Sequence, residues 1–185
     1  MHANTSVQML LDIALDALRN GENWRSVLDG LPVPVYTTDA NGAVTYWNQF
    51  CVDFVGREPR LGEDRWCVTW HLYTTAGDPL PHDKCPMARA IREKREIRDE
   101  IIIAERPDGH RFACRPYPTP YFDAGGDLLG AVNLIIDVTE EQAGALADQA
   151  ARCKRLADST NDQRASMILA QMAKDYAASA AALRD

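Results

Sequence analysis

The sequence predicts an α+β fold in which the strands form an antiparallel sheet. Strand-like runs flank two turn sequences, at residues 39–42 and 107–109, so each turn is predicted to join a β-hairpin. A third run, residues 128–136, is apolar except for Asn133, which indicates a strand covered on both faces. Helical periodicity is found before, between and after these strands.

The elements follow in a simple order. Five strands are predicted, at residues 33–38, 43–47, 98–106, 110–121 and 128–136, with short helices at 48–54 and 86–94. An amphipathic helix over residues 5–20 precedes them. Its apolar residues fall on one stripe: Val7, Leu10, Leu11 and Leu18. A sheet domain alone would leave this stripe exposed, so we expect a second subunit or a partner to cover it.

Two features of the middle of the chain are informative. Residues 57–84 are irregular but rich in aromatic side chains, so this loop is expected to fold over something. In the fourth strand, Pro116, Pro118 and Pro120 share one parity, and three backbone donors are therefore missing along one side. The distal half of that strand is expected to have an unpaired flank.

The last predicted strand runs almost without linker into a long helix. Asp137 ends the apolar run, and Thr139 with Gln142 matches a capping box at the start of the helix. A break at residues 158–162 precedes a final helix with a heptad-like seam. The seam consists of Ala165, Leu169, Met172, Tyr176, Ser179 and Leu183. Such a joint can pass a change in the sheet to a helix, so Asp137, Thr139 and Gln142 are the predicted signal-transmission residues.

Composition excludes several classes of partner and site. The 185 residues carry a net charge of −7, which disfavours nucleic acid and anionic membranes as general partners. No apolar run is long enough to cross a bilayer. The five cysteines are odd in number, scattered and without a CxxC pair, which favours reduced thiols in a cytoplasmic protein over disulfides or a zinc site.

The order of elements resembles a PAS sensory domain from about Leu28 to Glu141. The resemblance rests on residues 38–42, on 106–109 and on 130–140, and residues 77–81 with 85–88 are similar to the variant fused to bacterial histidine kinases. It implies a five-stranded antiparallel sheet with helices on one face and a small-molecule pocket between them. It divides the chain into an N-terminal helical segment (1–27), a PAS domain (28–141) and a C-terminal helical extension (142–185).

Candidate pocket residues follow from this resemblance and from the pattern of the last strand. They are Tyr36, Trp66, Trp70, His71, Cys114, Asn133 and Ile135. Asn133 is the most informative, because an amide within an apolar strand needs hydrogen-bond partners. Two kinds of partner remain open for it: local backbone, or a ligand in the pocket. The other residues are equally compatible with an ordinary core.

Haem is the cofactor that the residues allow, with His71, His82 or Cys85 as the axial ligand. The plainer interpretation treats residues 82–84 as a polar approach to a helix and Cys85 as a small residue at its start. Cys85 at that helix start is also a candidate redox sensor, although no resolving cysteine is near in sequence. The flavin-binding light-sensing subclass of the family carries Gly-Arg-Asn-Cys-Arg-Phe-Leu-Gln, which is absent here, so a cysteinyl–flavin adduct is not expected.

The sequence therefore predicts a non-catalytic regulator that forms a homodimer through its flanking helices and binds a signalling protein such as a histidine kinase. Two alternatives remain: a haem-binding redox or gas sensor, and a ligand-free interaction scaffold. An enzyme is disfavoured, because Asp78, His82, Asp83 and Cys85 place no third group that would orient a Cys–His pair.

Overall fold

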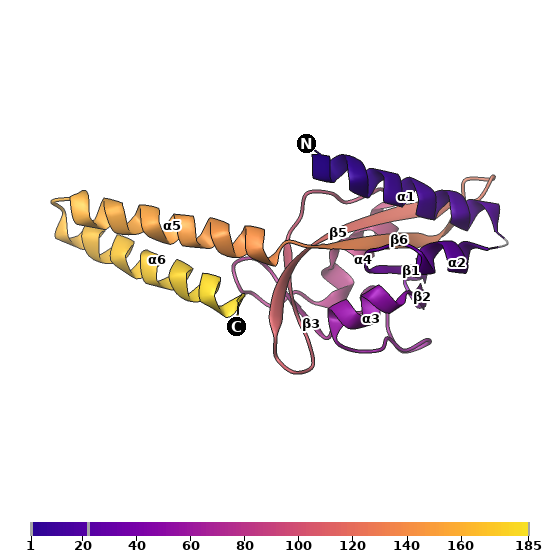
Figure 1. The fold of residues 1–185 in the computed structure, drawn as a ribbon, viewed down its shortest axis with the longest axis horizontal. Helices are drawn as coiled ribbons and strands as arrows, with labels where there is room; N and C mark the ends of the chain where they lie inside the picture. The colour runs from indigo at the N-terminus through magenta and orange to yellow at the C-terminus, as the bar shows by residue number, and fades with distance from the viewer. Residues whose placement is uncertain (1, 22, 185) are drawn as a thin grey trace.

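The computed structural model describes residues 2–21 and 23–184. Its centre is a six-stranded antiparallel sheet with strand order β2-β1-β6-β5-β4-β3 (Figure 1). The strands are β1 (Val35–Asp39), β2 (Val44–Trp47), β3 (His71–Tyr73), β4 (Ile102–Glu105), β5 (Arg111–Phe122) and β6 (Leu128–Asp137). The α+β class and the antiparallel sheet are confirmed, with six strands instead of five.

The additional strand, β3, lies in the loop that the sequence left irregular. It pairs with β4, and Leu72 stands opposite Ala104. Only three residues long, β3 has too few positions to show the alternation by which a strand is recognised in a sequence. Its pairing covers the edge of β4 that would otherwise end the sheet.

Strand β6 lies inside the sheet, between β1 and β5, and both of its faces are covered. Val132 and Leu134 are buried on one face, while Ala131 and Ile135 are buried on the other. This double burial explains why the strand is a continuous apolar run without polar alternation.

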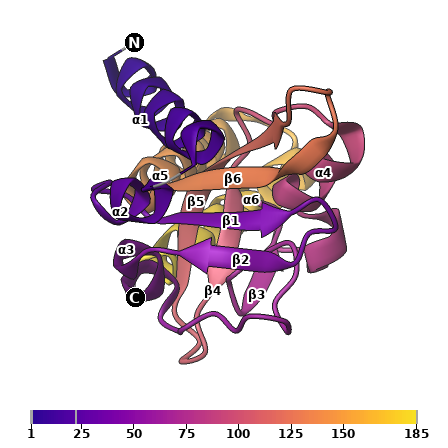
Figure 2. The same ribbon diagram turned by 90° about the vertical axis from the view of Figure 1, so that its right-hand side faces the viewer.

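Helices cover both faces of the sheet, as the end-on view in Figure 2 shows. The face that buries Ala131 packs against α3 (Gln49–Val55) and α4 (Pro86–Glu93), with the short helix η1 (His82–Lys84) leading into α4. The opposite face packs against α1 (His2–Asn20) and α2 (Trp24–Asp29). The helices within the PAS-like core, α3 and α4, therefore lie on one face as expected, and the N-terminal helices cover the other face.

The apolar stripe of α1 is buried by the chain itself. Val7, Leu11 and Ala14 contact the cluster that contains Val132 and Leu134, while Leu10 and Leu18 pack at its margin as half-buried side chains. The expectation that the chain leaves this stripe exposed is wrong. The face of the sheet that carries Val132 and Leu134 is itself apolar, so α1 and this face bury each other. A dimer interface must therefore use other residues.

The distal half of β5, which carries Pro116, Pro118 and Pro120, has the unpaired flank that was predicted. Strand β4 pairs only with the first part of β5, so the distal part is without a strand partner on that side. Pro118 offers its carbonyl oxygen to the backbone N–H of Ile97 and to Arg98 on that side. The missing N–H groups therefore leave no unpaired donor at this edge.

The two C-terminal helices form an antiparallel hairpin that projects from the sheet (Figure 1). They are α5 (Thr139–Ser159) and α6 (Gln163–Ala182). Residues at heptad spacing, all small except one leucine, line the contact on α5: Ala143, Leu146, Ala150, Cys153 and Ala157. On α6 the inward residues are Ala165, Leu169, Ala173, Tyr176, Ala180 and Leu183.

The predicted seam is therefore correct at four positions and displaced at two. Met172 and Ser179 are exposed, and their neighbours Ala173 and Ala180 face α5 instead. The close approach of two helices favours the smaller alanine side chains at the contact. Among the described residues, no helix combines the length and the apolar character that crossing a membrane requires.

Candidate functional site

The face of the sheet that buries Ala131 and Ile135 is called the inner face. A chain of hydrogen bonds crosses this face where β1 pairs with β6 at Tyr36 and Asn133. The Asn133 side chain accepts from the backbone N–H of Tyr117 at 2.8 Å and donates to the Tyr36 hydroxyl at 3.1 Å. The Tyr36 hydroxyl in turn donates to the Trp66 carbonyl oxygen at 3.0 Å. Of the two kinds of partner left open for Asn133, the structure provides protein groups.

Trp66 is held in a tight turn on the loop that covers this face. Its φ is 67°, which is uncommon for a residue with a side chain, and Cys67 N–H donates to the Arg65 carbonyl across it at 2.8 Å. The indole ring lies against Gly42, where a Cβ would fall 2.0 Å from Cζ3. A three-residue turn with positive φ stores backbone strain, so the surrounding contacts hold it in place.

Five of the seven predicted pocket residues gather at this face. Tyr36, Cys114 and Ile135 are buried in one cluster with Ala131, Trp66 packs against it, and Asn133 is 3% exposed. Trp70 and His71 do not join them, and that part of the prediction is wrong. Trp70 is half exposed and stacks edge-on with His71, which sits on the edge strand β3 with its side chain exposed.

Four of the five cysteines belong to the same cluster: Cys51, Cys67, Cys85 and Cys114. Burial in this apolar surrounding raises the pKa of the Cys51 and Cys114 thiols. Cys67 differs, because a hydrogen bond from the Cys85 side chain lowers its pKa, while the same contact raises the pKa of Cys85. The core thus holds one thiol pair of unequal acidity beside two inert thiols.

The residues of the inner face do not fit a flavin or a haem. The polar atoms of Tyr36 and Asn133 are satisfied by protein groups, so they offer no free partners to a ligand. His71 and His82 both line a surface hollow of about 330 Å³ beside β3. That hollow is flanked by exposed side chains, whereas a haem site is largely enclosed and apolar.

Cys85, the candidate haem thiolate and candidate nucleophile, is enclosed by the protein. Its sulfur is buried at the start of α4, where it accepts from the backbone N–H of Ala88 at 3.5 Å. His82 lines the surface hollow beside β3, and Cys85 is not among the residues that line that hollow. No group of three metal-ligating side chains comes together within residues 2–21 and 23–184.

The joint between β6 and α5 is built on the backbone of Ala113 in β5. The Thr139 hydroxyl accepts from Ala113 N–H at 3.1 Å and lies 3.3 Å from its carbonyl oxygen, to which Val138 N–H also donates at 3.0 Å. Asp137 accepts from the Thr139 N–H at 2.8 Å. The predicted capping box is wrong, because Thr139 binds the neighbouring strand and Asp137 satisfies the first free N–H of the helix.

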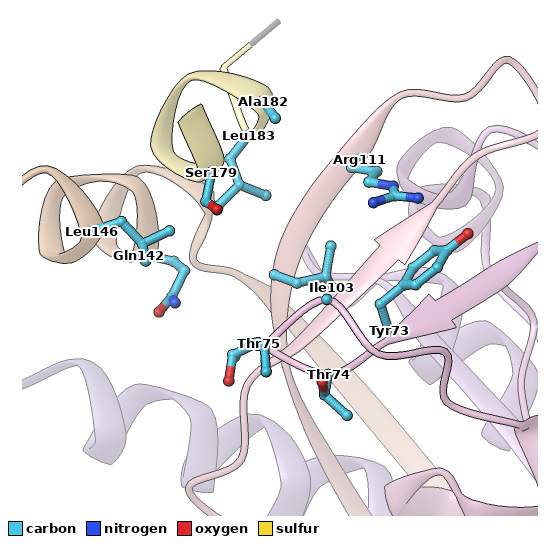
Figure 3. Close-up of a pocket in the computed structure, with 12 residues that line it drawn as sticks. Tyr73, Thr74, Thr75, Ile103, Arg111, Gln142, Leu146, Ser179, Ala182 and Leu183 are labelled. Carbon is cyan, nitrogen blue, oxygen red and sulfur yellow. The ribbon is translucent and has the colours of Figure 1, made fainter. Parts of the chain in front are cut away.

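The base of the hairpin rests on the sheet through a small apolar cluster. Its buried members are Ile103, Ala113, Val138, Ala143 and Leu183. A hollow of about 130 Å³ lies beside it, between the loop after β3 and both hairpin helices (Figure 3). Gln142 lines this hollow from α5, opposite Tyr73 and Arg111, whose guanidinium lies 4.0 Å above the Tyr73 ring.

Sequence reasoning missed Ala113 and Leu183 as residues of the joint. Ala113 acts through its backbone alone, which no side-chain pattern reveals. Leu183 was placed on the hairpin seam, and its contact with Ile103 and Ala113 depends on the fold of the hairpin. Asn48 was also missed. It is buried, caps α3 by accepting from Cys51 N–H, and donates to the Val33 carbonyl oxygen.

Comparisons with known proteins agree with this architecture. A family model described as PAS fold matches residues 28–143. None of the curated proteins matches the chain. Among solved structures, an RNA-binding light-oxygen-voltage receptor is 22% identical with a TM-score of 0.51, covering 66% of this chain and 36% of the receptor.

Two further structures resemble parts or nearly all of the chain. The PAS domain of the fruit-fly ELK potassium channel is 21% identical with a TM-score of 0.49, covering 61% of this chain and 92% of that domain. A light-oxygen-voltage protein of Rhodobacter sphaeroides is 17% identical with a TM-score of 0.48, covering 96% of each chain. At these identities the likeness concerns the fold alone.

Proposed function

The chain belongs to the PAS fold family, and from this premise we propose that it is a non-catalytic sensory regulator that controls a signalling protein through its C-terminal hairpin. The observation that carries the proposal is the joint at Thr139. Central strand β6 enters α5 without a linker, and the first turn of α5 is hydrogen-bonded to β5. A shift of β5 relative to β6 therefore changes the attachment of the helix.

The outer surface of the hairpin supports a role in binding. Leu156, Met167, Ile168 and Met172 are exposed by 39% or more. Leu156, Met167 and Ile168 lie toward the end of the hairpin away from the sheet, where α5 ends and α6 begins, and Met172 lies at the middle of α6. A cluster of large apolar side chains on a projecting hairpin is typical of an interaction surface. We propose that this surface forms the homodimer, or binds the signalling partner, in place of the buried stripe of α1.

The partner that we propose is a histidine kinase or another two-component protein. This rests on residues 77–81 and 85–88, which resemble the variant fused to such kinases. All five cysteines are free thiols, which fits a reducing cytoplasm. The division of the chain at residues 27 and 141 belongs to the same proposal.

A ligand-free interaction module is the second candidate, and one observation favours it. The hydrogen-bonding groups of Asn133 and Tyr36 are paired with each other and with backbone groups. A core satisfied in this way keeps its shape without a ligand. In a ligand-free module, a protein that binds the PAS domain would supply the signal in place of a ligand. The signal would still pass to the hairpin through the joint at Thr139.

Two matched variants test the joint. Thr139→Val removes the hydroxyl and keeps the branched shape, whereas Thr139→Ser keeps the hydroxyl. Thr139→Val should cost about 1–2 kcal/mol, because the buried Ala113 N–H loses its acceptor. It should also speed amide hydrogen exchange in the first turn of α5 and weaken signalling output in cells. Thr139→Ser should preserve exchange protection and output. Unchanged output in a folded Thr139→Val protein would exclude the joint as the point of transmission.

Light scattering tests the interaction surface. The wild-type chain should form a dimer at high concentration, and replacement of the exposed Ile168 by Asp should abolish it. An equivalent charge at the exposed Met9 on α1 should leave the dimer intact. A wild-type protein that stays monomeric at every concentration would rule out the homodimer.

A further inference from the structure

Two cysteines that are far apart in sequence lie next to each other under the loop of residues 57–84. The Cys85 sulfur is 3.8 Å from the Trp66 carbonyl oxygen, and that carbonyl carbon is bonded to the nitrogen of Cys67. Both side chains are buried in the same apolar cluster, and each is the leading cause of the shift in the other's pKa. Cys85 therefore has the neighbouring thiol that its sequence context lacks.

We propose that Cys67 and Cys85 form an oxidation site at which hydrogen peroxide converts the two thiols to an intramolecular disulfide, which ties the loop to the start of α4. The site does not depend on the identity of the signalling partner. It needs only the contact between a loop residue and the residue that precedes helix α4.

The surroundings make Cys67 the attacking sulfur. It lies 3.0 Å from the Thr69 hydroxyl, and both this group and the Cys85 thiol can donate to a thiolate. His82 acts on the pKa of Cys67 in the same direction. These contacts lower the pKa of Cys67, and the thiolate is the species that reacts with peroxide. Cys51 and Cys114 lack such donors, and burial raises their pKa.

The chemistry proceeds in two balanced steps. The Cys67 thiolate attacks one peroxide oxygen, so that an S–O bond forms, the O–O bond breaks and hydroxide leaves. The Cys85 sulfur then attacks the resulting sulfenic acid: the S–S bond forms, the S–O bond breaks and water leaves, with the Cys85 proton passing to the departing oxygen. In total two thiols lose two electrons, and hydrogen peroxide is reduced to two water molecules.

The route for a small oxidant is the hollow beside β3. It is lined by Leu80 and His82, and Leu80 packs against the cluster that holds both sulfurs. Leu80, on an irregular part of the loop, therefore borders both the hollow and the cluster. Peroxide is small enough to pass when this loop opens locally.

Oxidation would change the contacts at the start of α4. The Cys85 sulfur now accepts from Ala88 N–H as the N-cap of the helix and points to the Trp66 carbonyl oxygen. Closing the disulfide draws this sulfur to about 2.0 Å from that of Cys67. Helix α4 packs on β5 and β6, so a displaced helix start acts on the two strands that form the output joint.

The test is peroxide treatment of the folded chain, followed by intact mass and non-reducing peptide mapping. The wild-type protein should lose two hydrogen atoms and give one crosslinked peptide pair that contains Cys67 and Cys85. Dithiothreitol should restore the original mass. Cys51→Ser and Cys114→Ser are the matched controls, since both thiols lie in the same core, and each variant should form the crosslink as the wild type does.

Single variants of the pair identify the role of each sulfur. Cys85→Ser keeps a good N-cap for α4, and its Cys67 sulfenic acid should be trapped by dimedone. Cys67→Ser should give neither the crosslink nor the dimedone adduct at Cys85. The proposal is overturned if the folded wild type forms no disulfide, if the crosslink joins other cysteines, or if it appears only after unfolding. Retention of native circular dichroism in each variant separates these outcomes from loss of the fold.

Discussion

At the scale of single residues, the inner face of the sheet depends on one strained turn and on the glycine against which it packs. Gly42 has a φ of +85°, and the Trp66 ring occupies the space that a Cβ would need. Gly42→Ala should therefore destabilise the protein by about 3 kcal/mol, because the ring must move as well as the backbone. Urea unfolding measures the change.

Gly77 supplies the control for this prediction. Its φ is +91°, but nothing lies within 4 Å of an added Cβ. Gly77→Ala should cost about 1 kcal/mol, the ordinary penalty of a left-handed backbone for a residue with a side chain. Equal losses in the two variants would show that the Trp66 ring contributes nothing at Gly42.

Asn133 carries the second prediction at this scale. Asn133→Ala should cost about 2 kcal/mol in urea unfolding, because Tyr117 N–H is left buried without an acceptor. Tyr36→Phe removes the other end of the Asn133–Tyr36 bond. The double variant should be more stable than the sum of the single losses predicts, by about 1 kcal/mol, since both substitutions remove the same bond. Strict additivity would mean that the bond makes no net contribution.

Residue identities could be predicted only where a local rule decides them. Asn133 was recognisable because a polar side chain interrupts an apolar run, whereas its partners Tyr36 and Tyr117 come from other strands. Trp70 and His71 were misplaced because the sequence shows an aromatic loop without showing which way each ring points. The Cys67–Cys85 contact had no signal, since it depends on how the loop folds over the sheet.

At the scale of elements, the hairpin is attached to the sheet at its base. Leu183 is buried against Ile103 and Ala113, far along the chain from both. Leu183→Ala should cost about 2 kcal/mol and should raise amide exchange in the last turn of α6. Leu156→Ala is the control, because Leu156 is 56% exposed near the far end of α5, and its loss should cost less than about 0.5 kcal/mol. Equal effects would show that the base is not the anchoring point.

Elements with strong periodicity were predictable, and short or context-dependent ones were not. The buried strand β6, the hairpin helices and the unpaired flank of β5 follow from apolar runs and from proline parity. The three residues of β3 carry no pattern. The predicted capping box does not form, because the Thr139 hydroxyl is hydrogen-bonded to the Ala113 backbone in β5 and not to the first turn of its own helix. The cover provided by α1 also depends on an apolar sheet face that only the assembled fold presents.

At the scale of the whole molecule, two buried thiols and one buried tyrosine make the free energy of unfolding depend on pH in the alkaline range. Burial raises the pKa of Cys51 and Cys114 above the ordinary thiol value of 9.0, and that of Tyr36 above 10.0. Above these ordinary values the unfolded chain loses protons that the folded chain keeps. Stability is then fully present below pH 9.0 and falls as the pH rises.

The contribution of Cys67 to stability depends on pH in the opposite direction, because the pKa of Cys67 is lowered in the folded state. Its contribution is complete above the unfolded thiol value and is lost as the pH falls below it, so it does not offset the alkaline decline. Urea midpoints measured at neutral pH and at steps above pH 9.0 should therefore decrease. A Cys51→Ala and Cys114→Ala double variant should show a shallower decrease, and an unchanged slope would assign the effect to other groups.

The prolines of β5 have a consequence beyond their own strand. A second molecule that tried to extend the sheet along the distal part of β5 would find carbonyl oxygens but no N–H groups at Pro116, Pro118 and Pro120, and Ile97 and Arg98 already bind one of those carbonyls. Strand addition requires both kinds of group in alternation. This margin is thus protected against fibrillar growth, so the self-association that we propose for the projecting helices would carry no hazard of sheet-to-sheet polymerisation at that edge.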